Sequence, residues 1–320
     1  MRAIRVAQFG EPEVLKLEEV PTPTPAAGQV LVHVRAAGVN PYETYMRAGT
    51  YPIKPAVPYT PGSDAAGVIE SVGPGVTKVK PGDRVYTVQI PFGAYAEYAL
   101  AQENQVERLP EEISFAQGAG VWVPYGTAYH ALFHSAQARA GESVLIHGAS
   151  GGVGTSAIQT GRAMGLKIFG TAGSDAGLEL IKREGADHVF NHTKPGYEDE
   201  ILKATGGTGV DIILEMIANV NLPKDLKLLA KYGRVIVIGN RGETTINPRE
   251  LMSRHASVRA FALWGITDQE AKEMHAGLRA GLANGTLRPV VGKEIPLAEA
   301  PRAHKEILEP GSVGKIVLIP

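Results

Sequence analysis

The sequence predicts an α/β protein in which a β-rich region precedes a doubly wound parallel sheet. Up to about residue 123, short strand-like runs are broken by turns. From about residue 124, β-branched runs alternate with segments of helical length, the pattern of a parallel sheet covered by helices. The chain of 320 residues also exceeds the roughly 250 to 300 residues at which one hydrophobic core stops growing, so we expect two domains.

The first region is predicted to be a compact β domain. Gln29 to Ala36 alternate in polarity, Ala65 to Val72 are mostly apolar, and a Pro-Gly-Asp turn precedes the run from Arg84 to Val88. The segment PTPTPAAG at residues 21–28 is short and lies between strand-like runs. We therefore interpret it as a surface loop rather than an interdomain linker.

The second region is predicted to begin near Pro124. Its expected strands are Ser143–His147, Lys167–Thr171, His188–Phe190, Ile212–Glu215 and Arg234–Ile238. Beyond Val258 we expect a helix over 268–283, a second helical segment over 296–308 and a last strand over 315–319.

Composition excludes several classes of function. The formal net charge is −1, which gives no general attraction to nucleic acid or to an acidic membrane surface. The chain has no cysteine, so disulfides, thiolate zinc sites, iron–sulfur clusters and thiol nucleophiles are excluded. No apolar run is long enough for a membrane span, and the first residues lack the apolar core of a signal peptide, so we expect a soluble cytoplasmic protein.

Residues 144–154, VLIHGASGGVG, run from an apolar strand through a glycine-rich turn into a predicted helix over 153–164. Gly151 and Gly154 let the backbone approach an anion, and the first amides of the helix carry positive partial charge. Ala149 stands at the first glycine position of the GxGxxG pattern, so the match is imperfect. The segment favours a nicotinamide dinucleotide with its pyrophosphate at this turn.

The next strand indicates which dinucleotide. A ribose-binding carboxylate is expected about 20 residues past the glycines in NAD-binding units, but the strand here ends GTAGS, at residues 170–174. Asp175 follows where a helix should begin, so we interpret it as a first-turn acid. The site favours NADP; Lys182 and Arg183 are candidates for its phosphate, with a solvated helix face as the alternative. His192 is a further candidate for the adenosine end.

Four segments carry a family resemblance: GVNPYETYMRAGTY at 38–51, PYTPGSDAAGVIESVG at 58–73, GTAYHAL at 126–132 and the glycine loop. Together they resemble the zinc-independent medium-chain dehydrogenase/reductases, specifically quinone oxidoreductases of the zeta-crystallin type, over nearly the whole chain. The resemblance implies a GroES-like catalytic domain at 1–123, a Rossmann domain at 124–262 that binds NADP, and a segment at 263–320 that returns to the catalytic domain.

The zinc-dependent relatives bind their metal through cysteines and the histidine of a GHE motif. Here that motif is Gly62-Ser63-Asp64, and Asn40 stands near the place of the first cysteine. Serine and amide groups do not replace thiolate and imidazole as zinc ligands, so we expect no catalytic zinc. The chain's histidines show no compact ligand spacing, and we expect each to be satisfied locally. Asp64 is a candidate either for a carboxylate near the cleft or for a buried partner of an arginine.

The resemblance also implies the site residues. Those expected near the acceptor and the nicotinamide are Asn40, Tyr45, Tyr51 and Thr127, with the Asn40 amide and the tyrosine hydroxyls donating hydrogen bonds to a developing oxyanion. Packing alone is the alternative reading of this aromatic-rich segment. Those expected on the cofactor are Tyr45, Ser150, Gly151, Gly152, Val153, Gly173, His192, Asn221, Ile238, Gly239, Asn240, Arg241, Phe261, Ala262 and Leu263, with Asn219 as an alternative to Asn221.

The activity implied is reduction of quinones by NADPH without a metal. Relatives are described as passing one electron at a time to give semiquinone, but no residue here dictates that over hydride transfer. An NADPH-dependent enone or alkenal double-bond reductase is the alternative enzyme, and an AU-rich RNA-binding or structural lens role is a further one. We expect a homodimer or homotetramer with its contact around Arg241 to Trp264.

Overall fold

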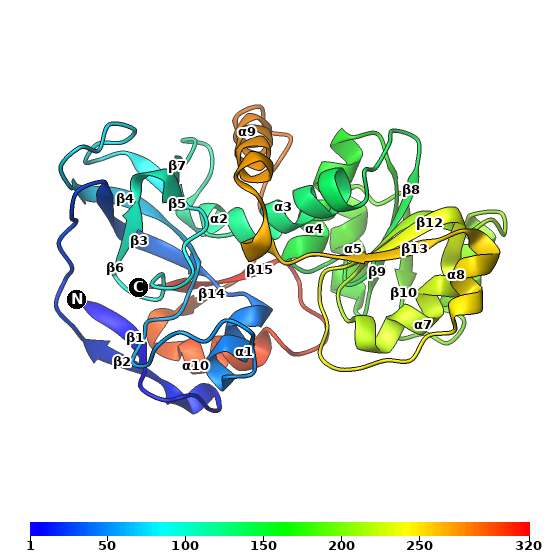
Figure 1. The fold of residues 1–320 in the computed structure, drawn as a ribbon, viewed down its shortest axis with the longest axis horizontal. Coiled ribbons are helices and arrows are strands. Elements are labelled where there is room, and N and C mark those ends of the chain that lie inside the picture. Colours follow the sequence, from blue (N-terminus) through cyan, green and yellow to red (C-terminus); the bar gives the residue numbers. More distant parts are fainter. The chain divides into compact units, whose positions relative to one another are not determined.

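The computed structural model describes residues 1–320 and divides them into two compact units. The first unit comprises Met1–Val123 and Arg288–Pro320, and the second comprises Pro124–Leu287. The chain thus leaves the first unit once and returns to it, so that the red C-terminal strand lies among the strands of the first unit in Figure 1. None of the helices combines the length and apolar character that a membrane crossing requires.

The first unit is built on strands that pair antiparallel except at one edge, where the last two strands of the chain pair in parallel. A hairpin of β1 (Arg2–Val6) and β2 (Leu15–Glu19) accompanies a larger sheet. In order, that sheet contains β14 (Val291–Pro296), β15 (Lys315–Ile319), β3 (Gln29–Gly38), β4 (Asp64–Val72), β5 (Arg84–Thr87) and β7 (Val106–Arg108), with β6 (Tyr98–Gln102) also paired to β3. The helices of this unit are α1 (Pro41–Ala48), α2 (Phe115–Gly118) and α10 (Ala300–Glu306), and α3 (Trp122–Tyr129) begins at its boundary.

The alternating pattern of β3 buries one face in the core of the first unit. Val30, Val32 and Val34 of this strand join one buried apolar cluster, which the C-terminal Ile316 and Leu318 complete. The last strand therefore supplies core residues to the first unit as well as hydrogen bonds. Sequence analysis identified β3, β4, β5 and β15 but not the first hairpin, β6, β7 or β14.

The second unit holds the predicted doubly wound sheet, which is confirmed. Its six parallel strands lie in the order β10 (His188–Asn191), β9 (Lys167–Ala172), β8 (Ser143–Ile146), β11 (Val210–Glu215), β12 (Leu229–Val237) and β13 (Ser257–Ala260). The helices between them are α4 (Gly152–Ala163), α5 (Asp175–Glu184), α6 (Tyr197–Ala204), α7 (Ala218–Leu228) and α8 (Pro248–Arg254). The strand order reverses at β8, which lies between β9 and β11.

Both faces of this sheet are buried, as a sheet covered by helices on two sides requires. Successive residues of β8 alternate between two clusters: Val144 and Ile146 pack with α4, and Leu145 packs with residues of α6 and α7. This explains why the strands of the second region are continuously apolar and those of the first region alternate.

The predicted boundary at residue 263 is corrected by α9 (Asp268–Ala283), which stays in the second unit. Its Glu270 Oε1 lies 3.2 Å from the Nε2 of His130, and its Gly277 faces Tyr129 so closely that an added Cβ would come within 2.5 Å of that ring. The return to the first unit therefore begins at Arg288. The boundary after Val123 coincides with the expected one.

The edge strand β13 lies within the segment where the oligomer contact is predicted. It pairs with β12 on one side only, and Met252 and Trp264 on either side of it are 72 % and 60 % exposed. An unpaired strand edge is a site where a second chain can add strands. The homo-oligomer stays a prediction, which the molar mass in solution tests.

His304 gives the first unit a pH-dependent stability. The Tyr95 hydroxyl donates to Glu43 Oε2 at 2.7 Å, so its oxygen accepts from the Nε2–H of His304 at 3.2 Å, and the Nδ1 of His304 is buried without a partner. Burial, assisted by the charge of Arg47, lowers the pKa of His304 to about 3. The folded protein thus holds this imidazole neutral, whereas the unfolded chain protonates it below about pH 6.5.

We expect the unfolding free energy of the wild type to fall as the pH drops from 6.5 toward 3, by up to about 1.4 kcal/mol per pH unit from this group alone. The H304Q variant keeps a donor to Tyr95 but does not titrate, so its stability should decline less over that range. Urea denaturation at several pH values measures the slopes, with H255Q at an exposed histidine as the matched control. Equal slopes for H304Q and wild type would contradict the assignment.

Candidate active site

The glycine loop ends at the N-terminus of α4 without any side chain capping that helix. Gly151 is the N-cap residue, in an extended conformation with φ −78° and ψ 177°. The amide of Gly151 itself bonds to Gly148 O at 3.1 Å, and the helix ladder begins with Thr155 bonded to Gly151 O at 2.9 Å. The first-turn amides therefore point to the loop with their positive partial charge uncompensated, the geometry that binds phosphate oxygens.

The two glycines singled out in the sequence have different structural roles. A Cβ on Gly154 would lie 2.5 Å from the backbone of Ala149, so this glycine allows the loop to pack on the helix. A Cβ on Gly151 would meet only Gly148 O, at 3.5 Å, an ordinary contact. The space in front of Gly151 is thus not used by the fold, and it is the space that a pyrophosphate would take.

The end of β9 has no carboxylate in the ribose position. Ser174 caps α5 by accepting a hydrogen bond from Gly177 N at 3.2 Å, and Asp175 lies in the first helical turn as expected. A Cβ on Gly173 would come within 2.8 Å of the Nε2 of His192, so these two predicted residues lie together. Lys182 and Arg183 are exposed in the last turn of α5.

Three ionisable side chains meet where the strand order reverses. His147 follows β8, Glu215 ends β11 and Asp225 lies in α7, and all three are buried. The Nε2 of His147 lies 2.8 Å from Asp225 Oδ1 and 3.7 Å from Glu215 Oε2. Two ligands of one zinc ion at about 2.1 Å in tetrahedral geometry lie about 3.4 Å apart, so the 2.8 Å separation is that of a hydrogen bond. The sequence does not reveal this group, because His147 is far from Glu215 and Asp225 along the chain.

The pKa values of this group are displaced by burial and by mutual attraction. Burial lowers the pKa of His147, but the charge and hydrogen bond of Asp225 outweigh it, so the net shift is upward. Burial raises the pKa of Glu215 to about 7, against the opposing charge of His147. The histidine is therefore satisfied locally, as expected, but by two acids at a strand end rather than by the backbone.

The loops after β11 and β12 are joined by side-chain amides. Asn219 Oδ1 accepts from Arg241 N at 3.0 Å, and Asn240 Oδ1 accepts from Asn219 N at 3.0 Å. Asn221, the residue expected on the cofactor, instead donates to Glu215 Oε1 at 3.2 Å. Ile238 bonds through its amide to Glu215 O at 2.8 Å. Asn219 thus shapes the loop and Asn221 belongs to the buried ionisable group.

Two of the residues expected at the nicotinamide half, Phe261 and Leu263, lie beside α3 and the helical turn that follows it. The ring of Phe261 stacks on His130 with 4.2 Å between centroids. A Cβ on Gly126 would lie 3.6 Å from Leu263, and Thr127, the next residue of α3, is buried. These residues are all in the second unit, whereas Asn40, Tyr45 and Tyr51 are in the first.

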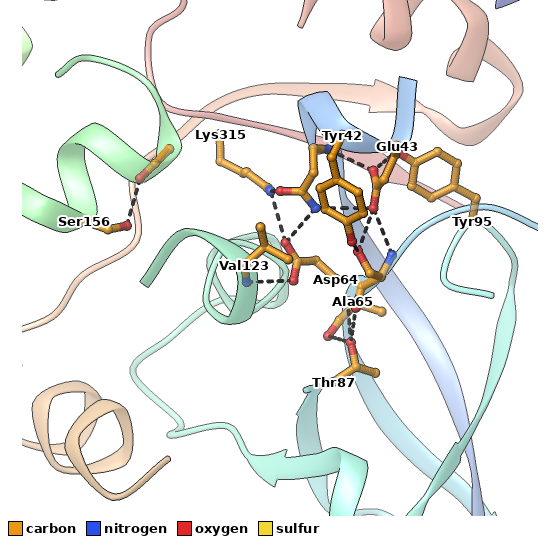
Figure 2. A network of polar contacts seen from close by, with 12 residues as sticks. Tyr42, Glu43, Asp64, Ala65, Thr87, Tyr95, Val123, Ser156 and Lys315 are labelled. Carbon is orange, nitrogen blue, oxygen red and sulfur yellow. Dashed lines mark hydrogen bonds and ion pairs between the residues drawn. The ribbon is translucent and has the colours of Figure 1, made fainter. Parts of the chain in front are cut away.

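In the first unit, Lys315 faces Asp64 within the polar network that Figure 2 shows. Its Nζ is 3.1 Å from Asp64 Oδ2 and also donates to Asn40 Oδ1. The Nδ2 of Asn40 donates to Asp64 Oδ2 at 3.0 Å and to Glu43 Oε1 at 3.3 Å. Both hydrogens of the Asn40 amide are therefore used inside the protein, and the buried partner of Asp64 is a lysine, not an arginine.

Glu43 is the centre of the same network. It receives hydrogen bonds from Tyr95 OH at 2.7 Å, from the amide and hydroxyl of Ser63 at 3.0 and 2.8 Å, and from Asn40 N at 2.9 Å. The hydroxyls of Tyr42 and Ser63 are also bonded to each other. Burial raises the pKa of Glu43, and the positive charge of Lys315 opposes that shift. This network fixes the start of α1 against β4.

The two tyrosines expected near the acceptor flank the end of α1. The backbone oxygen of Tyr45 accepts from Thr50 N at 3.0 Å and from Tyr51 N at 3.3 Å, which closes the helix. Both side chains are half-buried, and the ring of Tyr51 lies 5.6 Å from that of Tyr42. The hydroxyl of Tyr45 makes no hydrogen bond within the protein, unlike the Asn40 amide.

Known proteins resemble this chain in sequence over its whole length. Residues 26–111 match the family described as alcohol dehydrogenase GroES-like domain, and residues 152–278 match the family described as zinc-binding dehydrogenase. A quinone oxidoreductase from Rattus norvegicus is 53 % identical over 321 residues, covering 100 % of this chain and 98 % of its own.

Solved structures agree with the sequence relatives. Escherichia coli quinone oxidoreductase complexed with NADPH has a TM-score of 0.90 at 31 % identity, with 100 % of both chains covered. The CurK enoyl reductase has a TM-score of 0.90 at 27 % identity, covering 99 % of this chain and 98 % of its own.

The contrast between Gly151 and Gly154 gives a test of the loop. We expect G151V to fold with an unchanged melting temperature and to bind NADPH at least 100-fold more weakly, because its side chain fills the anion space without touching the fold. We expect G154V to lose stability, since its side chain meets the Ala149 backbone. Thermal unfolding and fluorescence titration with NADPH measure both effects. Unchanged NADPH affinity in G151V would refute the placement of the pyrophosphate.

Proposed function

This chain belongs to the medium-chain dehydrogenase/reductase family, in its zeta-crystallin type of quinone oxidoreductases, and we propose that it reduces quinones with NADPH without a metal. Full-length identity of 53 % to a protein named quinone oxidoreductase is the observation that carries the proposal. The N-terminus of α4, whose N-cap residue makes no side-chain hydrogen bond, would bind the cofactor's pyrophosphate.

The residues of the second unit fit a phosphorylated dinucleotide. Ser150, Gly151, Gly152 and Val153 would hold the pyrophosphate. Gly173 and His192 would face the adenosine end, where no carboxylate stands in the ribose position to repel a 2′-phosphate. The structural relative that carries NADPH supports the same choice.

The first unit supports metal independence through the chemistry of its residues. No cysteine is available as a thiolate ligand. Ser63, in the place of the histidine, donates to Glu43, and Asn40, near the place of the first cysteine, is bonded to Asp64 and to the Lys315 ammonium. A cationic side chain in this position neutralises the nearby carboxylates and leaves no electron-rich ligand set for a second cation.

The chemistry then depends on position and exclusion of water. NADPH, when bound, supplies the reducing equivalents. The protein would hold the nicotinamide against an electron-poor acceptor, with Thr127 beside the ring. Tyr45 would donate a hydrogen bond to the acceptor oxygen, because its hydroxyl is free of protein partners. Asn40 would act through position, as the N-cap residue of the helix that carries Tyr45.

The fold relation to an enoyl reductase makes double-bond reduction the second candidate. Both reactions place the same cofactor atom against a conjugated acceptor, so the acceptor alone separates them.

One assay distinguishes the two candidate reactions. It measures NADPH and NADH oxidation with an ortho-quinone, a para-quinone and an α,β-unsaturated aldehyde as separate acceptors, with and without a chelator. We expect quinone turnover, at least tenfold preference for NADPH in kcat/KM, and no effect of the chelator. Turnover with the aldehyde only would move the function to double-bond reduction. Loss of activity in chelator would contradict metal independence.

The hydroxyl of Tyr45 gives a residue-level test. We expect Y45F to lower kcat about tenfold or more with little change in the Kd of NADPH, because the hydrogen bond to the acceptor is needed in the transition state. Y98F, at a half-buried tyrosine of β6, is the matched control. Equal kcat in Y45F and wild type would assign Tyr45 to packing.

A further inference from the structure

The buried His147, Glu215 and Asp225 have no role in the proposed reaction, yet they occupy the point where the strand order reverses. Ligands of doubly wound sheets bind outside the carboxyl ends of the strands at this point. Glu215 and Asp225 are 0 % exposed, and each keeps one carboxylate oxygen, Oε2 and Oδ2, without a hydrogen-bond partner. Burying three ionisable side chains costs free energy unless hydrogen bonds and opposite charges among them compensate for the lost hydration.

One side of this group reaches His192 through a single hydroxyl. The Oγ1 of Thr171, at the end of β9, lies 3.5 Å from His147 Nδ1 and 3.3 Å from His192 Nδ1. The amide of Gly148, in the glycine loop, also donates to this oxygen at 3.3 Å. The other side reaches Asn221 directly, through Glu215 Oε1. The group therefore contacts Asn221 directly, and it reaches His192 and the glycine loop through the Thr171 hydroxyl. His192 and Asn221 are both residues that we expect to bind the cofactor.

The hydrogen-bond inventory allows one consistent arrangement around Thr171. A hydroxyl has one donor and two acceptor positions. The Gly148 amide fills one acceptor position. If His147 is an imidazolium, its Nε2–H donates to Asp225 and its Nδ1–H fills the second acceptor position of Thr171. The Thr171 hydrogen must then go to the Nδ1 of His192, so the proton of a neutral His192 is on Nε2.

The Nε2 of His192 points to Gly173, since a Cβ there would come within 2.8 Å of it. A proton on Nε2 makes this nitrogen a donor toward the adenosine end, where the cofactor carries phosphate and ribose oxygens. A neutral His147 would reverse the direction of these hydrogen bonds, because its Nδ1 would accept from the Thr171 hydroxyl. The Nδ1 of His192 would then have to donate, and Nε2 would become an acceptor facing an anion.

From this geometry we propose that the buried group of His147, Glu215 and Asp225 is a positioning device that, through Thr171, keeps the proton of His192 on Nε2 and so strengthens NADPH binding. The proposal rests on the proposed cofactor site. His147, Thr171, Glu215 and Asp225 are positioning residues, and only His192 would touch the cofactor.

The surrounding charges agree with this arrangement. The net upward shift in the pKa of His147 favours the imidazolium, and the pKa of His192 is lowered by burial and by the charge of His147, which keeps His192 neutral. Glu198, at the start of α6, adds negative charge near His147, and Lys224 of α7 lies 2.9 Å from Glu198. Tyr197, also packed here, has a pKa raised by burial and so stays neutral.

The test combines nuclear magnetic resonance of ¹⁵N-histidine-labelled protein with NADPH titration. In the wild type at pH 7 we expect His147 protonated on both nitrogens and His192 protonated on Nε2. In T171V, which removes the hydroxyl, we expect His192 to lose the preference for Nε2–H and the Kd of NADPH to rise about tenfold, the loss of one hydrogen bond to a charged group. At saturating NADPH, kcat should stay within twofold of wild type.

Two further variants separate the effect of the Thr171 hydroxyl on His192 from general structural damage. T171S restores the hydroxyl and should restore both the tautomer and the Kd, whereas T208V removes the hydroxyl of a threonine in the turn after α6 and should change neither. A wild-type spectrum with His192 protonated on Nδ1 would overturn the proposal, even if T171V does not fold.

Unchanged NADPH affinity and tautomer in folded T171V would also overturn it. So would one equivalent of divalent metal in the purified protein lost on H147Q, since a metal on Nε2 excludes the proton there. A wild type that binds no NADPH would refute the proposed function instead. The histidine spectrum would still show whether the buried group keeps the proton of His192 on Nε2.

Discussion

The reversal of strand order between β8 and β11 is the constraint on which the second unit depends. The helices that follow these neighbouring strands cover opposite faces of the sheet, so the chain leaves their carboxyl ends in opposite directions. The glycine loop, Glu215 and the loop after β11 all begin at this edge. The order of the strands thus brings the glycine loop and a pair of buried acids to one place, although His147 and Glu215 are far apart in sequence.

A buried positive charge has the corresponding role in the first unit. Glu43 and Asp64 are both buried. The ammonium group of Lys315 contacts the carboxylate of Asp64 and the side-chain oxygen of Asn40. Leaving two such carboxylates without a cation would cost several kcal/mol, because an unpaired buried charge has lost its hydration. Lys315 opens β15, so the return of the C-terminus to the first sheet completes its electrostatics as well as its core.

The two units solve the same problem in different ways. The first unit pairs its buried carboxylates with the ammonium group of Lys315, and the result is a hydrogen-bonded start of α1. The second unit pairs them with a histidine, whose charge depends on the arrangement of protons around it. The first arrangement suits a framework that presents tyrosines, and the second can control the direction of hydrogen bonds at a ligand.

The amino-acid sequence determined the local elements and the glycine loop, because these depend on the period of apolar residues and on contacts within a few positions. Such local patterns predict the helix over 268–283, the strand over 315–319 and the alternation of strands and helices. The tertiary structure decided which side chains share a site. It placed Lys315 beside Asn40, used both hydrogens of that amide, and kept α9 in the second unit. It also joined Glu215 and Asp225 to His147 and Thr171. Such pairings follow from strand order and packing between distant segments, which no local pattern in the chain records.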